Sequence, residues 1–175
     1  AKVRPDGSTV LAYDQKEIDK LDPEHMFESM GEKSNGFELP GWEPERMARI
    51  KELFELYRDV NADVLFDNLV YFLKAIQPVC EQYDIKMAIH PDDPAWPVFG
   101  LARITTGKEQ LLKLMKAVDA PFNGVTLCTG SLGSNPDNDI PDIIRSLKGR
   151  IHFAHVRNLQ YNAPGDFQEA AHLSA

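Results

Sequence analysis

The sequence predicts an α/β fold built on a parallel β-sheet, because short apolar segments alternate with helical segments along its second half. The apolar runs at residues 85–90, 124–128 and 150–156 are typical of buried strands. Amphipathic helical segments at residues 108–118 and 139–147 separate these runs. Strand, loop and helix repeated in this order form right-handed βαβ units, which place the strands parallel to one another.

The first half of the chain follows a different pattern. Residues 1–43 are polar and rich in Gly, Pro and Asp, which predicts a long loop or lid-like segment. Residues 44–83 carry apolar side chains at helical spacing and predict two helices, with Asn61 as the N-cap of the second and Pro78 kinking or ending it. Residues 84–175 hold the βα units, and we interpret the whole chain as part of a single domain.

Composition and charge argue against several classes of protein. The net charge of −8 is unlike that of a nucleic-acid-binding domain, which needs a basic patch. The sequence has no apolar run of about 18 residues, so we expect no membrane span. The N-terminal residues lack the apolar stretch of a signal peptide. We therefore expect Cys80 and Cys128 to be free thiols in a reducing, cytoplasmic environment.

Residues able to bind a metal ion stand at the ends of all three predicted strands. His90, Cys128 and His155 each lie at or near the carboxyl end of a strand, and the spacing between them suits one βα repeat each. In a (β/α)8 barrel those ends share one face, where active sites are built. In an open doubly wound sheet they share an edge. Either architecture could bring the three side chains around one ion.

The side-chain chemistry of His90, Cys128 and His155 is compatible both with a metal site and with structural roles. Imidazole and thiolate ligands suit a divalent transition ion such as zinc or iron, and manganese also fits once harder oxygen ligands join them. The alternative is purely structural. His90 and His155 would then be hydrogen-bonded residues at strand ends, and Cys128 a small core residue, since free cysteine is commonly buried.

Two aspartates follow the first predicted ligand. Asp92 could be a metal ligand, a substrate contact or a base, or it could serve only the turn that Pro-Asp-Asp-Pro favours. For Asp93, which directly precedes Pro94, we favour the turn.

Polar residues after the other two strands are candidate substrate contacts. Arg157 could clamp a substrate carboxylate in bidentate fashion or pair with a neighbouring acid, and Asn158 follows it. His172, in a possible lid or short helix, is a weaker candidate. Residues 128–135 offer backbone N–H groups and hydroxyls to an anion, although a flexible βα loop has the same composition. His152 has odd separation from His155 in a strand, so we interpret it as structural.

Long blocks of the sequence resemble mannonate dehydratase, and the resemblance runs through nearly the whole chain. The blocks are GEKSNGFELPGWEPERM, KMAIHPDDPAWPVFGLARI, GVTLCTGSLGSNPDNDIP and RIHFAHVRN. The resemblance implies a (β/α)8 TIM barrel related to the xylose-isomerase-like sugar enzymes. This chain would cover a central part of the barrel, with about three βα units and an N-terminal loop and helical region.

The resemblance also implies an activity and a cofactor. It implies a hydro-lyase of glucuronate breakdown that converts D-mannonate into 2-dehydro-3-deoxy-D-gluconate with Mn²⁺ or Fe²⁺, in the cytoplasm and as a homodimer. In that family the ion is held by His, Cys, His and Asp, and the first three match His90, Cys128 and His155. The Asp, and the His and Tyr thought to handle protons, belong to a segment similar to RPDHG. That segment is absent from this sequence, so we expect these residues beyond Ala175 and the 175-residue chain alone to be inactive.

Two other functions fit the same residues. A metal-dependent sugar isomerase or epimerase on the same barrel would use the same ligands at the strand ends without losing water. A non-catalytic barrel fragment would act as a binding or assembly module, which the missing ligand segment favours for this polypeptide.

Overall fold

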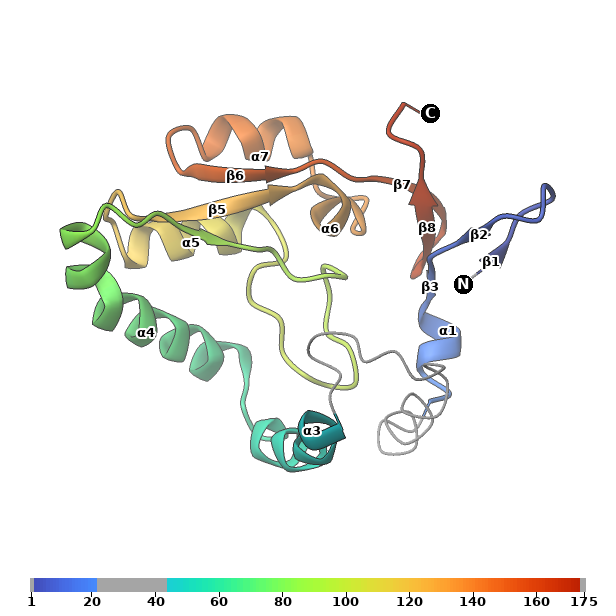
Figure 1. The fold of residues 1–175 in the computed structure, drawn as a ribbon, viewed down its shortest axis with the longest axis horizontal. Coiled ribbons are helices and arrows are strands. Elements are labelled where there is room, and N and C mark those ends of the chain that lie inside the picture. The colour runs from blue at the N-terminus through green and yellow to red at the C-terminus, as the bar shows by residue number, and fades with distance from the viewer. Residues whose placement is uncertain (1, 22–43, 174–175) are drawn as a thin grey trace.

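A parallel sheet of three strands lies at the upper left of the computed structural model in Figure 1, and the model describes residues 2–21 and 44–173. Its strands are β4 (Met87–Ile89), β5 (Asn123–Cys128) and β6 (Ile151–His155), in the order β4-β5-β6. Both neighbouring pairs are parallel. The prediction of a parallel α/β sheet from the three apolar runs is therefore confirmed.

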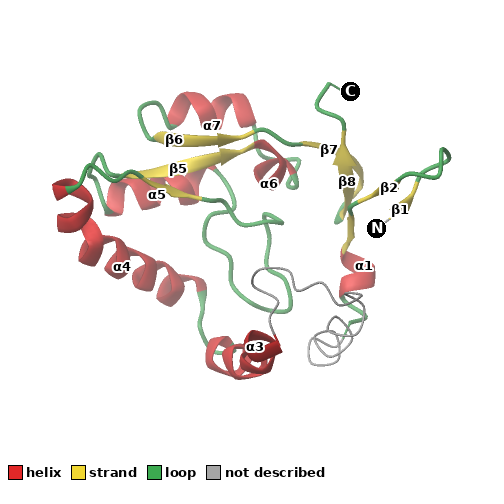
Figure 2. Cartoon of the chain, in the orientation of Figure 1, coloured by secondary structure: helices red, strands yellow, loops and turns green. Residues whose placement is uncertain are grey.

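Helices follow the strands as the sequence predicts, and they form most of the remaining regular structure (Figure 2). Asn61 accepts a hydrogen bond from the Val64 amide, so the predicted N-cap is confirmed, and Asp139 caps α7 in the same way by accepting one from the Asp142 amide. The helices are α1 (Gln15–Ile18), α3 (Pro44–Tyr57), α4 (Ala62–Gln82), α5 (Lys108–Ala117), α6 (Thr129–Gly133) and α7 (Ile140–Ser146).

Two local expectations about helices concern Pro78 and the segment after β5. Helix α4 continues through Pro78 to Gln82, so of the two alternatives, a kink or an end at the proline, the end is wrong. The segment after β5 was expected to be a loop, but Thr129–Gly133 forms the short helix α6 directly after Cys128. Among the described residues, no helix is both long and apolar enough to cross a membrane.

The hydrophobic core lies between β5 and the helices that pack against the sheet. All six residues of β5 are buried, because β4 and β6 cover its two edges and side chains cover its faces. Helices α5 and α7 contact each other, and α5 also contacts β5. The most deeply buried large side chains of this core are Leu73, Leu111, Leu114, Phe122, Val125, Leu132, Ile143 and Leu147.

A glycine allows β6 to approach β5 closely. A Cβ atom on Gly124 would lie 2.5 Å from the carbonyl oxygen of Arg150 and 2.4 Å from Nδ1 of His152. That ring nitrogen in turn lies 2.7 Å from the carbonyl oxygen of Met87 in β4. His152 thus ties β6 to β4 across the glycine, a structural role like the one the sequence indicated.

A second, antiparallel sheet faces the carboxyl ends of the parallel strands (Figure 1). It consists of β3 (Ala12–Asp14), β8 (Asp166–Ala170) and β7 (Asn158–Ala163), in the order β3-β8-β7. The sheet pairs the start of the chain with its last described strands, since Tyr13 lies opposite Phe167.

The prediction of a long loop for residues 1–43 is therefore wrong for residues 2–21. They hold the hairpin of β1 (Lys2–Val3) and β2 (Thr9–Val10), then β3 and α1. The rest of the expected lid-like segment, residues 22–43, lies outside the described residues.

Aromatic side chains join the antiparallel sheet to the loop after β4. Tyr13 and Phe167 stack with ring centroids 5.2 Å apart, and Trp96 packs edge-on against both, at 5.6 and 5.9 Å. The Oε1 atom of Gln15 accepts hydrogen bonds from the Tyr13 hydroxyl at 2.6 Å and from Trp96 Nε1 at 2.8 Å. This cluster holds the antiparallel sheet beside the ends of the parallel strands.

Candidate metal centre

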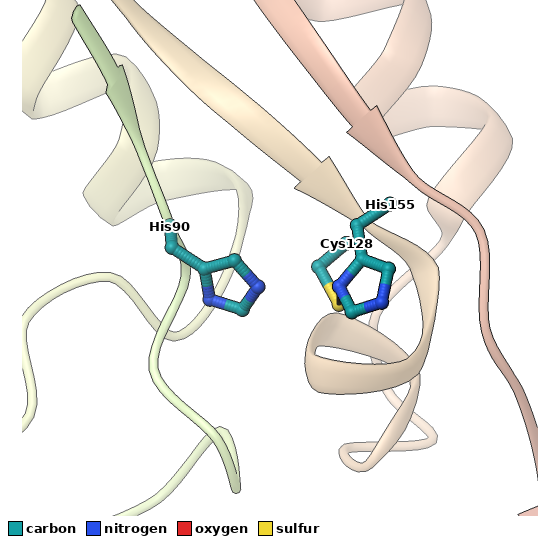
Figure 3. Close-up of side chains that lie close together, drawn as sticks. All are labelled: His90, Cys128 and His155. Carbon is teal, nitrogen blue, oxygen red and sulfur yellow. Dashed lines mark hydrogen bonds between the residues drawn. The ribbon is translucent and has the colours of Figure 1, made fainter. Parts of the chain in front are cut away.

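The three side chains predicted to bind a metal lie together beyond the ends of the parallel strands (Figure 3). Cys128 and His155 are the last residues of β5 and β6, and His90 directly follows β4. One ligand atom from each of the three residues lies within 4.8 Å of the other two. Parallel strands in adjacent positions thus bring together residues that are far apart in the sequence.

Cys128 forms the buried floor of this cluster. Its side chain is completely buried, and its Sγ atom caps the N-terminus of α6. The Ser131 hydroxyl donates to Sγ at 3.0 Å, and the Ser131 amide donates to it at 3.4 Å. These two donors orient the sulfur at the strand end.

The two histidines form the open side. Nδ1 of His90 lies 2.7 Å from the Pro91 carbonyl oxygen, which can only accept, so Nδ1 is the donor, and in the neutral ring Nε2 then has a free electron pair. A metal-binding histidine is commonly oriented by such a bond from its other nitrogen. Nδ1 of His155 lies 3.5 Å from Sγ of Cys128, and the two imidazole rings are 5.9 Å apart between centroids. Both histidines are exposed, so an ion can reach them.

The geometry fits a transition-metal ion. With bonds of about 2.0–2.3 Å, ligand atoms around one ion are about 3–4 Å apart. The observed upper limit of 4.8 Å therefore requires only small rotations of exposed imidazoles. Within residues 2–21 and 44–173, no carboxylate joins the cluster, which supplies two nitrogens and one sulfur. Such a set suits divalent zinc, iron or manganese when further oxygen ligands complete the shell.

Asp92 and Asp93 point to different partners. Both carboxylate oxygens of Asp92 are engaged: Oδ2 accepts from the amides of Ile104 and Thr105 at 2.9 and 2.8 Å, and Oδ1 from Arg103 at 3.3 Å. It thereby holds the loop after β4 in shape. Asp93 was interpreted as a turn residue only, but its Oδ2 accepts from Nη1 of Arg157 at 2.5 Å. That ion pair links the loop after β4 to the segment after β6.

Arg157 pairs with acids at the rim of the sheet, as one of the two sequence interpretations proposed. Its guanidinium contacts the carboxylates of Asp93 and of Glu169 in β8, and Nη1 lies 3.4 Å from the Ser131 hydroxyl. Partial burial by itself would lower the pKa of Arg157. The hydrogen bonds that Arg157 donates to Glu169 and Asp93 outweigh this effect and raise the pKa of Arg157 above its ordinary value.

The other two candidate substrate contacts lie on the antiparallel hairpin. Asn158 opens β7, and its Nδ2 donates to the Ala171 carbonyl at 2.9 Å. His172 is exposed, with Nε2 3.0 Å from the Val156 carbonyl oxygen. It lies in a turn after β8, so the short helix, one of its two expected settings, is wrong.

A pocket of about 380 Å³ adjoins the rim, between the antiparallel sheet and the loop after β4. Its charged lining consists of Asp93, Arg103, Arg157 and Glu169, and mostly apolar side chains, among them Leu11 and Phe99, form the rest. Two of its lining residues follow candidate ligands closely in the sequence, since Asp93 comes three residues after His90 and Arg157 comes two after His155.

Sequence reasoning missed three residues that shape this region. Ser131 and Thr129 lie in the segment interpreted as an anion-binding or flexible loop, but Ser131 bonds to Cys128 and Thr129 to the backbone of Arg157. Cys128 caps α6 in place of the usual Ser, Thr, Asp or Asn, so the sequence carried no standard signal for this helix. Glu169 gave no signal, because its strand β8 was not predicted.

Comparison with known proteins decides the family. The family model for D-mannonate dehydratase (UxuA) matches residues 1–175. The chain belongs to this family. A mannonate dehydratase of Brachyspira hyodysenteriae is 69% identical over 175 residues, which are all of this chain and 49% of that protein. A mannonate dehydratase of Thermotoga neapolitana is 54% identical over 99% of this chain and 49% of its own length.

A solved structure shows the same fold. The crystal structure of mannonate dehydratase from Streptococcus suis serotype 2 matches with a TM-score of 0.78 and 39% identity, over 98% of this chain and 43% of that chain. The expectation that this chain forms part of the TIM barrel of the mannonate dehydratase family is confirmed. The chain spans about half the length of the curated relatives it matches.

Proposed function

We propose that the whole protein is a mannonate dehydratase, a hydro-lyase that converts D-mannonate into 2-dehydro-3-deoxy-D-gluconate. Membership of the family over residues 1–175 supports the activity. The observation that carries the proposal is the convergence of His90, Cys128 and His155 within 4.8 Å at the ends of three parallel strands. A structural role alone does not require two exposed imidazoles to face a buried thiol.

We propose that these three residues hold a divalent ion, Mn²⁺ or Fe²⁺. When bound, the ion supplies positive charge that stabilises the negative charge that develops on substrate oxygens as the C2 proton is removed. Cys128 is held in place by Ser131, and the Pro91 carbonyl orients His90 so that Nε2 is available. His155 completes the set from the next strand, with its ring open to solvent.

The rest of the reaction needs groups that the family resemblance places outside these 175 residues. The reaction removes the C2 proton and the C3 hydroxyl, so it requires a base and an acid for the leaving hydroxide. The resemblance assigns the fourth ligand, an Asp, and the proton-transfer His and Tyr to a segment that this sequence lacks. We therefore propose that the 175-residue chain alone has no dehydratase activity.

The substrate contacts are part of the same proposal. Asn158, Asp92 and His172 remain predicted contacts for the sugar acid. Arg157, the fourth predicted contact, lines the pocket of about 380 Å³ and is already paired with Asp93 and Glu169. Asp92 is the weakest of them, because four donors of its own loop already engage its carboxylate.

The wider setting follows from the resemblance. We propose a cytoplasmic enzyme of glucuronate breakdown whose partner is a small sugar acid, and which assembles as a homodimer. Light scattering coupled to gel filtration measures the assembly directly, and a monomeric mass for the complete gene product would contradict the dimer.

Product analysis tests the activity. The complete gene product, loaded with Mn²⁺ and supplied with D-mannonate, is expected to form a 2-keto-3-deoxy acid. A ketose or a C2 or C3 epimer would indicate the isomerase alternative. The absence of both bound metal and mannonate binding would indicate a non-catalytic module.

Two cysteine variants test the metal site. Cys128→Ser should lose bound metal, because a serine hydroxyl is a far weaker ligand than a thiolate. Cys80→Ala is the matched control, since Cys80 is also a buried free thiol but lies in the core of the helical layer. Equal metal content in the two variants would remove Cys128 from the site.

A further inference from the structure

We propose that Arg157 is a positioning residue that ties together the three segments carrying His90, Cys128 and His155, and so sets the spacing of the metal site. The inference rests on the proposed function, since it concerns the metal site of that enzyme. It differs from the expectation that Arg157 binds the substrate carboxylate.

Each ligand is followed, within two or three residues, by a member of one hydrogen-bonded group. Asp93 comes three residues after His90, Ser131 three after Cys128, and Arg157 two after His155. Nη1 of Arg157 lies 2.5 Å from Oδ2 of Asp93 and 3.4 Å from the Ser131 hydroxyl. One guanidinium therefore connects the segments that follow β4, β5 and β6.

The contact with Ser131 reaches the metal site directly. The Ser131 hydroxyl that faces Arg157 also donates to Sγ of Cys128 at 3.0 Å. A shift of the guanidinium would release this hydroxyl and change the hydrogen bonding at the sulfur. Residues in this position relative to metal ligands typically affect metal affinity although they do not touch the ion.

The backbone of Arg157 is held as firmly as its side chain. The Arg157 amide donates to Oγ1 of Thr129 at 2.9 Å, and that hydroxyl donates back to the Arg157 carbonyl at 2.6 Å. Thr129 is the first residue of α6, next to Cys128. These two bonds join the segment after β6 to the segment after β5, beside two of the ligands.

A glycine in α6 leaves space for the arginine. A Cβ atom on Gly130 would lie 2.6 Å from Cβ, 2.9 Å from Nε and 3.1 Å from Cζ of Arg157. The arginine thus lies flat against the backbone of α6. Its position depends on the absence of a side chain at residue 130.

The charge around Arg157 disfavours a role as an anion clamp. Asp93 and Glu169 both pair with the guanidinium, so the group of three carries a net charge of −1 at neutral pH. An incoming substrate carboxylate would have to displace one of these acids or approach both of them. The same planar fork of five donors suits a residue that links several acceptors, which the single ammonium of lysine cannot reproduce.

Cobalt binding to the complete gene product, without substrate, tests the proposal. Co²⁺ serves as the probe, because a bound thiolate gives a sulfur-to-cobalt absorption band that reports on the geometry at Cys128. Arg157→Lys is expected to weaken Co²⁺ affinity by about 10–100-fold and to shift this band. Gly130→Ala should have the same two effects while the guanidinium is still present, because the new methyl group displaces it.

Arg150→Lys is the matched control. Arg150 lies at the opposite end of β6, pairs with Asp119, and has a side chain 21% exposed, against 20% for Arg157. It should leave cobalt affinity and the absorption band unchanged, which separates a general loss of stability from a change at the site.

Different results overturn different claims. Wild-type affinity and an unshifted band in both Arg157→Lys and Gly130→Ala would overturn the positioning role and leave the proposed function standing. If Arg157→Lys kept wild-type cobalt affinity and an unshifted band but raised the KM for D-mannonate, the arginine would be a substrate clamp. If the wild-type protein gave no sulfur-to-cobalt band at all, the metal site itself would fail, and with it this inference.

Discussion

The parallel and antiparallel sheets are built in opposite ways. In the parallel sheet, every residue of β5 is buried, and helices join the neighbouring strands: α5 between β4 and β5, and α6 and α7 between β5 and β6. In the antiparallel sheet, Phe167 is the one buried residue of β8, and the pairing of β3 with β8 joins residues 12–14 to residues 166–168. The first sheet is thus held by a shared core and the second by long-range pairing around a small aromatic cluster.

The difference bears on the site, because both sheets contribute to it. The parallel sheet supplies His90, Cys128 and His155, while the antiparallel sheet supplies Glu169, which pairs with Arg157. The ligands therefore come from the sheet with the larger buried core, and part of their surroundings comes from the sheet with the smaller one. Binding residues on a packed scaffold, with loops and edges around them, are the usual arrangement in α/β enzymes.

The largest effect is expected from removing a side chain shared by the parallel sheet and its helices. Phe122 is 2% exposed and belongs to the central core, and its carbonyl accepts from the Met87 amide. Phe122→Ala should lower the free energy of unfolding by about 3–5 kcal/mol, because it leaves a large cavity. Chemical denaturation measures the loss. A loss below about 1 kcal/mol would show that this core does not dominate stability.

The matching substitution in the antiparallel sheet should act more locally. Phe167→Ala removes the ring that stacks on Tyr13 and packs against Trp96. We expect a loss of about 3 kcal/mol, at the lower end of the range for Phe→Ala substitutions. Hydrogen exchange should show reduced protection in β3, β7 and β8, with β5 still protected. Equal loss of protection in both sheets would mean that the two regions unfold as one unit.

The same contrast explains which parts of the fold the sequence predicted. Local signals sufficed for β5 and α5, because an apolar run and an amphipathic period each report burial within one segment. No local signal paired Tyr13 with Phe167, since pairing over such a distance depends on the rest of the fold. Without knowledge of that pairing, the polar N-terminal segment has the composition of a loop.

The candidate site likewise contains residues that local sequence signals predicted and residues that they did not. The clustering of His90, Cys128 and His155 was predictable, because strand ends in a parallel sheet must lie at one edge. The roles of Ser131 and Glu169 were not. Ser131 lies in a helix capped by cysteine, which is not a usual capping residue, and Glu169 lies on an unpredicted strand.

A smaller effect should come from the caps of the helical layer. Asn61→Ala removes the hydrogen bond to the Val64 amide at the start of α4, and we expect a loss of about 1 kcal/mol. Asp139→Ala at α7 is the parallel test, with a similar bond to the Asp142 amide. Thermal unfolding of both variants measures the losses. If Asn61→Gly lost as much as Asn61→Ala, backbone freedom rather than the cap would be responsible, since glycine caps cost only a few tenths of a kcal/mol.

The smallest effect is expected from the ion pair between α5 and α7. Nζ of Lys108 lies 2.7 Å from Oδ2 of Asp142, and each side chain is 37% exposed. The hydrogen bond from Lys108 lowers the pKa of Asp142 below 3.8, and the same bond raises the pKa of Lys108 above 10.5. Both shifts stabilise the folded state when the two groups are charged.

The sign of the pH dependence follows from these two directions. The contribution of Asp142 is fully present above pH 3.8 and is lost as the pH falls through its lower folded pKa. The contribution of Lys108 is present below pH 10.5 and is lost as the pH rises through its higher folded pKa. The unfolding free energy of Asp142→Asn should therefore lie slightly below that of the wild type near neutral pH. This difference in unfolding free energy should vanish in strong acid, where the wild-type carboxylate is protonated. It should also shrink in high salt, because the pair is exposed and is screened. If the difference in unfolding free energy between the wild type and Asp142→Asn stayed constant from neutral pH to strong acid, the carboxylate charge would play no part in joining α5 to α7.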